Sequence, residues 1–205
     1  MENKVELTGI FGGDQEHAMS AWTSTSRDIT EEKWKRVPAL LKFLAENGHH
    51  TPFEKSYLQF LVTCDTASHI HLLKHRIGVS INAESGRYKE LKDDKYYIPE
   101  DWPEGLQHML QHNLKGQYIL YHGLIESLVA NGLDRKRAKE SARFVLPYSN
   151  QLTLDISFNF RSFMHFQGLR NKPDAQLEIQ NIAEKMLQLV KQDENFKYSL
   201  EAFCY

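Results

Sequence analysis

The chain has few cysteines and no long hydrophobic run, and these absences exclude several classes of protein. Two cysteines, Cys64 and Cys204, occur in 205 residues, and they form neither a CxxC motif nor a metal-ligand spacing. This usage argues against a disulfide framework, and we expect a reducing compartment, the cytoplasm. No hydrophobic run approaches the roughly 20 residues of a membrane span, and the first residues do not resemble a signal peptide. We therefore expect no membrane partner.

An excess of charge of one sign is also missing. Lys and Arg total 25 and Asp and Glu total 27, which gives a formal net charge of −2. A general nucleic-acid binder is usually basic, so we expect no nucleic-acid partner. The sequence contains no internal repeat or low-complexity tract, and 41% of its residues are hydrophobic. Length and composition fit a single globular domain over residues 1–205.

The spacing of hydrophobic residues predicts an α+β fold. A period of two predicts strands over residues 4–10, 56–64 and 151–158, which we expect to pair mostly antiparallel. A three–four spacing predicts one long helix over residues 104–131. Further helices are expected after Asp134, as an N-cap, after Asn159, and from Pro173. These long helices would cover the sheet.

Residues 74–88, KHRIGVSINAESGRY, hold the densest set of candidate site residues. The triplet at 74–76 is basic, and on a helix its side chains would point about 100° apart and meet different groups. The tripeptide Ser-Gly-Arg at 85–87 offers a hydroxyl, an open backbone N–H and a guanidinium suited to phosphate. These features indicate a site for an anionic or phosphorylated ligand. They are equally typical of a helix end followed by a turn.

Histidines near this triplet raise the alternative of a metal site. His71 and His75 are four residues apart and would share one face of a helix, with His69 close by. Because neither an HExxH motif nor a third carboxylate ligand accompanies them, we expect no metal.

Residues 89–104 form a long connection that is charged, aromatic and interrupted by Pro99 and Pro103. Connections of this length are often binding loops or lids. Its aromatic residues would either stack on a flat ligand or pin the loop to the core, and we favour pinning for at least one of Tyr96, Tyr97 and Trp102.

Four segments together resemble the signature motifs of the flavin-dependent thymidylate synthases. The family's RHR, seven or eight residues, then Ser is similar to the basic triplet followed by eight residues and Ser85. The other three segments resemble the family's H-x-T/S-P-x-E, E-x-A-R-x-x-L-P and N-x-R-S-x-x-H/N-F-x-x-x-R motifs. In this sequence they read HHTPFE from His49, ESARFVLP from Glu140 and NFRSFMHFQGLR from Asn159. Because Pro52 restricts Thr51, we expect the first of them to be a turn rather than a helix.

The resemblance implies the reductive methylation of dUMP to dTMP. The implied carbon donor is 5,10-methylenetetrahydrofolate, and the implied hydride donor is FAD reduced by NADPH. A homotetramer with active sites shared between subunits is implied as well. In such an enzyme the cofactor carries the difficult chemistry, while the protein binds, orients and polarises. Neither cysteine is placed like the nucleophile of the other class of thymidylate synthase.

The resemblance also implies a role for individual residues. Those on the flavin and folate side are His49, Thr51, Glu54, Lys74, His75, Arg76, Asn159, Arg161 and His165. Those expected to bind substrate are His71, Glu84, Ser85, Gly86, Arg87, Arg143 and Arg170. The catalytic set is expected to be Arg170, which would polarise the uracil ring, with Ser85 and His49.

Three departures from the family pattern keep alternatives open. Lys74 replaces an arginine, which exchanges a bidentate fork for a point charge. Glu84 is separated from Asn82 by one residue, and His71 stands where glutamine is common. The first two departures suggest a relative that binds FAD or a nucleotide without turnover. A nucleic-acid module that uses residues 74–76 and 134–137 is a weaker alternative, because the net charge is acidic.

Overall fold

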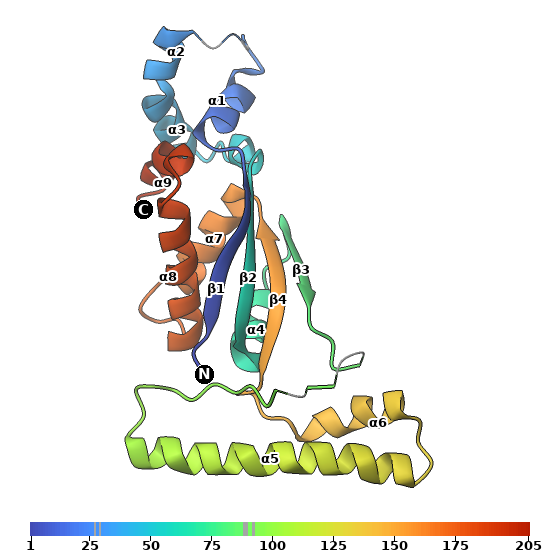
Figure 1. The fold of residues 1–205 in the computed structure, drawn as a ribbon. Helices are drawn as coiled ribbons and strands as arrows, with labels where there is room; N and C mark the ends of the chain where they lie inside the picture. Colours follow the sequence, from blue (N-terminus) through green and yellow to red (C-terminus); the bar gives the residue numbers. More distant parts are fainter. Residues whose placement is uncertain (27, 29, 88–89, 92) are drawn as a thin grey trace. The chain divides into compact units, whose positions relative to one another are not determined.

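The computed structural model describes residues 1–205 except 27, 29, 88, 89 and 92. Tyr88, which ends the basic stretch, therefore lies outside the described residues, as do Lys89 and Lys92 of the 89–104 connection. Within the described residues, four strands form one sheet in the order β1-β2-β4-β3 (Figure 1). Their bounds are β1 Lys4–Phe11, β2 Tyr57–Asp65, β3 Val79–Ala83 and β4 Gln151–Phe158.

Helices account for most of the remaining chain. The α-helices are α1 Asp14–Trp22, α2 Glu31–Lys35, α3 Val37–Glu46, α4 Thr66–Leu73, α5 Glu104–Ala130, α6 Arg135–Ala142, α7 Phe160–Arg170, α8 Leu177–Lys191 and α9 Lys197–Ala202. Short 3-10 helices are η1 Thr51–Glu54, η2 Arg143–Val145 and η3 Glu194–Phe196. None of these helices, in the part of the chain that is described, is long and apolar enough to cross a membrane.

The predicted α+β fold with an antiparallel sheet is confirmed, with local corrections. The three predicted strands are present, and β3 was not predicted because its apolar–polar alternation, in which Ser80 and Asn82 are the exposed members, extends over only five residues. The last long helix begins at Leu177 rather than Pro173, since residues 171–175 form turns. Residues 51–54 were predicted as a plain turn but form η1, because a proline fits the first turn of a helix.

The chain divides into two compact units. Unit 1 contains Met1–Lys4, Thr63–Leu72 and Asn82–Leu154, and unit 2 contains Val5–Val62, Leu73–Ile81 and Asp155–Tyr205. Each of the four described strands continues from one unit into the other.

The core of unit 2 is a cluster of phenylalanine rings. Phe158, at the end of β4, lies 5.7 Å from Phe163 and 5.3 Å from Phe166 between ring centroids, and both partners belong to α7. Helix α8 packs against α7 with a face of fully or almost fully buried apolar side chains: Ile179, Ile182, Ala183, Met186, Leu187 and Val190. Burial of such side chains contributes about 1.5–3 kcal/mol each, so this face fixes α7 on its strands.

A buried polar network in unit 2 ties α9 to α1. Asp14 accepts hydrogen bonds from the backbone N–H groups of Tyr198 and Ser199, at 2.8 and 2.7 Å, in the first turn of α9. The Ser199 hydroxyl donates to Asp14 at 2.5 Å. Ser199 Oγ therefore accepts from His17 Nδ1 at 2.8 Å, and Nε2 of His17 accepts from the Ser56 hydroxyl at 2.8 Å. Because burial lowers the pKa of His17 to about 3, this imidazole is neutral.

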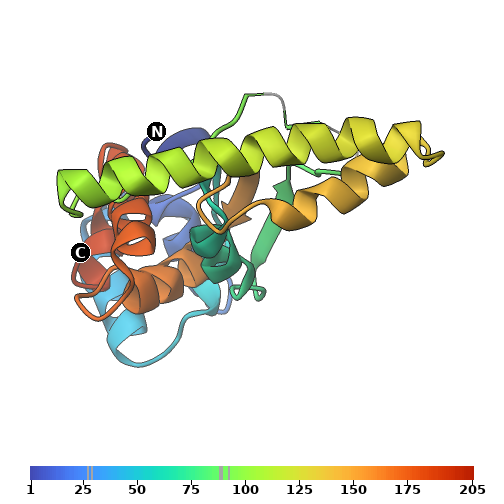
Figure 2. The same ribbon diagram turned by 90° about the horizontal axis from the view of Figure 1, so that it is seen from below.

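Unit 1 is built on the long helix α5. Its buried side chains are Leu114, Tyr118, Tyr121 and Ile125, and the last two form a core cluster with Ala138 and Ala142 of α6. Figure 2 shows α6 running alongside α5. Asp134 accepts a hydrogen bond from Arg137 N at 3.0 Å, which confirms the predicted cap of α6.

The described part of the 89–104 connection is pinned to the start of β4. Tyr96 lies 6.0 Å from the Tyr118 ring, and Tyr97 N donates to Ser149 O at 2.8 Å. The Tyr118 hydroxyl lies 2.7 Å from Lys95 O and 2.6 Å from Asn150 Oδ1. The prediction that aromatic residues hold this loop is confirmed for Tyr96.

The neutral state of His17 predicts an acid-sensitive stability. Its pKa is about 3 in the folded chain against 6.5 when unperturbed, so the unfolded chain binds one more proton between these values. This group therefore lowers the free energy of unfolding by about 1.4 kcal/mol per pH unit as pH falls below 6.5, and has no effect above it.

Urea unfolding of the wild type and of His17→Asn, at about pH 7.5 and about pH 5, measures this component. The variant is less stable at both pH values, because it loses part of the buried network. Its additional loss on acidification should be smaller than that of the wild type by about 2 kcal/mol. Equal losses in the two proteins would contradict the assignment.

Candidate functional site

A cavity of about 600 Å³ opens in unit 2, where η1, the loop after α4, and the first turns of α7 meet. Its lining residues are His50, Glu54, Ile77, Gly78, Asn159, Arg161, Ser162, Met164, His165 and Phe203. This lining combines apolar side chains with charged and hydrogen-bonding groups. A ligand that combines a flat ring with an anionic tail would match both kinds of group.

An ion pair orders the charged residues in the lining of the unit 2 cavity. Arg161 Nη1 lies 2.5 Å from Glu54 Oε1, and the two side chains are 49% and 31% exposed. Such exposure limits what the pair contributes to stability. Its effect is instead to hold the Arg161 guanidinium at the cavity wall, where it can bind an anion.

The loop before β3 is fastened to the start of α7. Asn159 N donates to Gly78 O at 3.0 Å, and the Ser162 hydroxyl donates to Ile77 O at 2.8 Å. Asn159 also caps α7, because its Oδ1 accepts from Ser162 N at 2.9 Å. Gly78 has a φ of +65°, and a Cβ at this position would lie 2.4 Å from both Asn159 Nδ2 and Ser162 Oγ. The fastening therefore requires glycine.

The structure separates the predicted flavin-side residues into two groups. Glu54, Asn159, Arg161 and His165 line the unit 2 cavity. His49, Thr51, Lys74 and Arg76 are exposed and do not belong to this lining. Helix α4 ends at Leu73, so the basic triplet lies in a loop rather than on a helix, although its side chains do diverge. His75 points inward and is 8% exposed.

The motif predicts His49 as a site residue, but the neighbouring His50 is the one that lines the cavity. His50 lies on the cavity wall, with its Nε2 3.2 Å from Ala45 O and its ring 5.4 Å from Phe203. His49 is exposed, 6.3 Å from the Phe43 ring. Sequence reasoning missed His50, and no periodic signal separates two neighbouring histidines that precede a proline-containing turn.

His75 supports the side chain of Arg170 through a hydrogen bond. Arg170 Nε donates to His75 Nε2 at 3.1 Å, so the imidazole carries its proton on Nδ1 in this arrangement. The His75 ring lies 5.1 Å from Phe166 and 6.2 Å from His165. This packing orients the guanidinium of Arg170 at the end of α7.

A second cavity, of about 350 Å³, lies in unit 1. It brings together Glu84, Ser85, Gly86 and Arg143 from the predicted substrate set. Sequence reasoning missed its other lining residues: Thr66, Leu91, Leu146, Pro147, Tyr148, Asn150 and Leu152. A hydroxyl, a backbone N–H and a guanidinium at one wall suit a phosphate or another anion.

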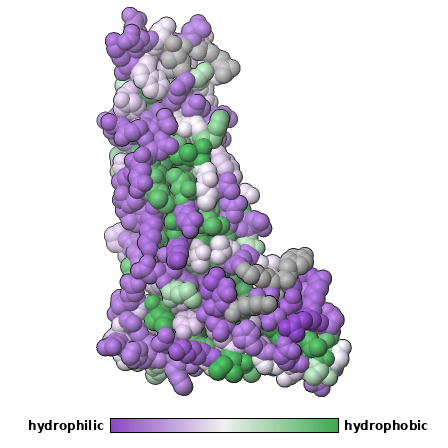
Figure 3. Space-filling view, in the orientation of Figure 1, coloured by the Kyte–Doolittle hydropathy of each residue, from purple (hydrophilic) through white to green (hydrophobic). Residues whose placement is uncertain are grey.

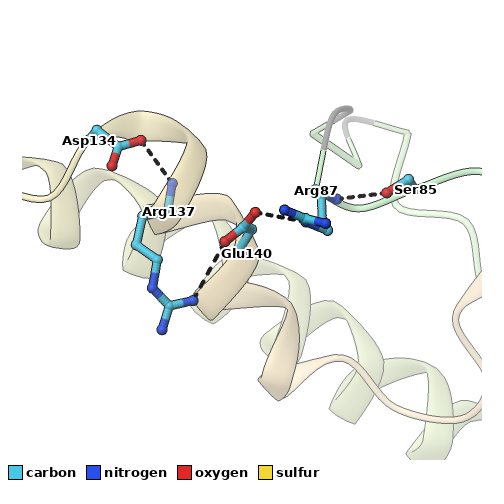
Figure 4. Close-up of polar contacts among 5 residues, drawn as sticks. All are labelled: Ser85, Arg87, Asp134, Arg137 and Glu140. Atoms are coloured by element: carbon cyan, nitrogen blue, oxygen red, sulfur yellow. Dashed lines mark hydrogen bonds and ion pairs between the residues drawn. The ribbon is translucent and has the colours of Figure 1, made fainter.

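Glu140 connects two of the predicted motifs in unit 1 (Figure 4). Arg87 Nε donates to Glu140 Oε1 at 2.8 Å, and Arg137 lies 3.7 Å from Oε2 of the same carboxylate. The hydrogen bond from Arg87 lowers the pKa of Glu140, which keeps the carboxylate ionised. Arg87 N also donates to Ser85 Oγ at 3.3 Å, which closes the turn. The 85–87 turn and α6 are thereby held together.

The remaining predicted substrate residues have other positions. Glu84 is tied to β4, because its Oε2 accepts from Thr153 N at 2.9 Å while Glu84 N donates to Thr153 O at 2.8 Å. It lines the cavity from this fixed position. His71 lies on α4 in unit 1, outside the lining. Arg170 belongs to unit 2.

The cysteines do not line either cavity. Cys64 is fully buried on β2, and burial raises the pKa of its thiol well above the ordinary value. Cys204 is exposed. The prediction that neither is placed as a nucleophile agrees with these positions.

Comparison with known proteins adds independent information. Residues 7–193 match the sequence model of a family described as Thy1, thymidylate synthase complementing protein. A flavin-dependent thymidylate synthase of Thermosipho africanus is 32% identical over 97% of this chain and 90% of its own length. Another, of Pseudothermotoga lettingae, is 31% identical over 91% of this chain and 84% of its own.

A solved structure extends this similarity to the fold. The crystal structure of a UMP/dUMP methylase, PolB, from Streptomyces cacaoi with bound 5-Br dUMP superimposes with a TM-score of 0.82. The two chains are 26% identical, and the match covers 99% of this chain and 95% of the other.

The fastening at Gly78 predicts a large effect of one added methyl group. Gly78→Ala is expected to lower the free energy of unfolding by more than about 1 kcal/mol, because its φ is positive and its Cβ meets two side chains. Gly116→Ala is the matched control: this glycine lies within α5 with nothing within 4 Å of its Cβ position, so alanine should stabilise by about 0.5–1 kcal/mol. Urea denaturation measures both, and similar values for the two variants would contradict the prediction.

Proposed function

This chain belongs to the Thy1 family of thymidylate synthase complementing proteins, and we propose that it is a flavin-dependent thymidylate synthase. The proposed reaction methylates dUMP to dTMP, with 5,10-methylenetetrahydrofolate as carbon donor and NADPH as the reductant of FAD. The observation that carries the proposal is the unit 1 cavity, whose lining includes Ser85, Gly86 and Arg143. Two motifs far apart in the sequence thus contribute to one cavity, which we propose to be an anion site.

The unit 1 cavity is proposed to bind the nucleotide. Ser85, Gly86 and Arg87 hold the phosphate, and Arg143 adds a cation beside Gly86, since a Cβ at Gly86 would lie 3.4 Å from Arg143 Cδ. Glu140 fixes Arg87 in this arrangement. His71 and Glu84 are proposed as further substrate contacts.

The unit 2 cavity is proposed to hold FAD. Its lining fits this cofactor, because Ile77, Met164 and Phe203 offer an apolar surface to a ring system while Arg161, His165 and Asn159 offer charge and hydrogen bonds. Lys74, His75 and Arg76 would meet the rest of the cofactor, and His49, Thr51 and Glu54 its folate-facing side. When bound and reduced, FAD supplies the hydride. The protein binds, orients and excludes water.

Arg170 is proposed as the residue that polarises the uracil ring. A guanidinium stabilises negative charge that develops on the ring carbonyl, and His75 keeps this one in place through the 3.1 Å hydrogen bond. Ser85 and His49 complete the proposed catalytic set. The Ser85 hydroxyl already accepts a backbone hydrogen bond from Arg87, which suits a binding role better than a nucleophilic one.

The protein is further proposed to act as a cytoplasmic homotetramer with active sites shared between subunits, in dTMP biosynthesis. Large apolar side chains support an assembled state: Phe144 is 80% exposed beside Arg143, and Ile119 on α5 is 74% exposed. Figure 3 shows further hydrophobic residues gathered around the strands of the sheet. Exposed apolar surface of this kind is commonly covered by another chain.

The visible spectrum of the purified protein tests the proposal. Flavin bands that bleach on anaerobic addition of NADPH, followed by dTMP formation from dUMP and methylenetetrahydrofolate, are the expected result. A yellow protein that makes no dTMP would instead indicate a relative that binds the cofactor without turnover. A protein that takes up no FAD at all would overturn the proposal.

The role of Glu140 gives a sharper prediction. Glu140→Gln removes the charge that holds Arg87, so KM for dUMP should rise about fivefold or more, while the Kd for FAD stays unchanged. Glu126→Gln is the matched control, because Glu126 also pairs with an arginine, Arg135 at 3.0 Å, and Arg135 is not one of the proposed phosphate residues. Steady-state kinetics measure both variants. An equal rise in KM for the control would show a general charge effect and contradict the prediction.

A further inference from the structure

Phe203 has an environment that differs from that of the other phenylalanines of its cluster. Its ring packs on Phe53 at 5.0 Å between centroids and on Phe160 at 5.9 Å, and both of these are fully buried. Phe203 itself is only partly buried, and it lines the unit 2 cavity. Among the described residues of that lining, it supplies the one phenyl ring. One side of this ring therefore belongs to the core and the other faces the cavity.

The position of Phe203 is fixed by the buried network that holds α9. Phe203 directly follows this helix, and its N–H donates to Leu200 O at 3.1 Å. The first turn of α9 is bonded to Asp14, and Ser199 is bonded to His17, with all three side chains at most 3% exposed. A helix held at its start and packed along its length leaves Phe203 little freedom. Its ring is thus preorganised before any ligand arrives.

The other lining residues indicate which kind of ligand would pack on the Phe203 ring. Ile77 and Met164 are further apolar residues of the lining, and Arg161, paired with Glu54, contributes a guanidinium. Aromatic side chains prefer to stack on flat conjugated rings, with an energy beyond that of simple burial. A flat heterocycle attached to an anionic tail would contact both the apolar residues and the guanidinium. A purely anionic or purely aliphatic ligand would contact only one of these two kinds of group.

We propose that Phe203 is a positioning residue for the isoalloxazine ring of FAD, which packs on its exposed face. This inference rests on the proposed function, because it takes FAD as the occupant of the unit 2 cavity. None of the four motifs that resemble the family includes Phe203, which lies beyond the last of them. The residue would fix the depth and tilt of the ring, while the motif residues bind polar groups.

Titration of apoprotein with FAD, followed by flavin fluorescence and visible absorption, tests the proposal. Phe203→Ala should raise the Kd for FAD about tenfold and shift the visible bands of the bound flavin toward those of free flavin. Phe203→Tyr keeps the ring and should stay within about threefold of the wild-type Kd, with wild-type bands. Unchanged Kd and bands in Phe203→Ala would overturn the inference, as would an effect confined to KM for the folate.

Phe196→Leu is the control for a merely structural effect. Phe196 is fully buried, stacks on Phe160 at 5.4 Å, and is absent from the cavity lining. This variant should lose stability in urea but bind FAD with wild-type bands. Band shifts in Phe196→Leu as large as those of Phe203→Ala would overturn the inference in favour of general loosening. If the wild type binds no FAD, the proposed function and this inference fail together, whereas FAD binding that is insensitive to Phe203 overturns the inference alone.

Discussion

The unit 2 cavity depends on the way Asn159 joins two segments of chain. Its backbone N–H holds the loop at Gly78, and its side chain caps α7 through Ser162. Because β4 ends immediately before Asn159, the strand, the helix and the loop all take their positions from this residue. The fastening works only with glycine at position 78, where any Cβ would collide with the two side chains that make it. The positions of the residues that line this cavity thus depend on the local backbone geometry at Gly78 and Asn159.

Much of the fold could be predicted from the sequence, because the hydrophobic period and the capping residues are local signals. The strand at β4 and the Asp134 cap of α6 are examples. The lining of the cavities could be predicted only in part. His50 was missed because its role depends on packing against Phe203, a residue 153 positions further along the chain. Tertiary contacts of this kind leave no periodic mark in the sequence.

Several motif residues act by holding other residues rather than by facing a cavity. His75 supports Arg170, Glu140 supports Arg87, and Glu84 is bonded to β4 at both its backbone and its side chain. A family motif therefore records supporting contacts as well as ligand contacts. Lys74, which stands where the motif has an arginine, is exposed and belongs to neither cavity lining.

The bond between Asp14 and Ser199 joins residues 185 positions apart, and this separation sets the order in which the molecule can be completed. A contact of this kind cannot form before residue 199 has been synthesised, and its closure entropy must be overcome late in folding. Helix α9, and with it the aromatic wall at Phe203, is consequently among the last parts of unit 2 to be placed. A nascent chain can thus carry most of the motif residues and still have an open cavity, so ligand capture by the finished site follows synthesis of almost the whole sequence.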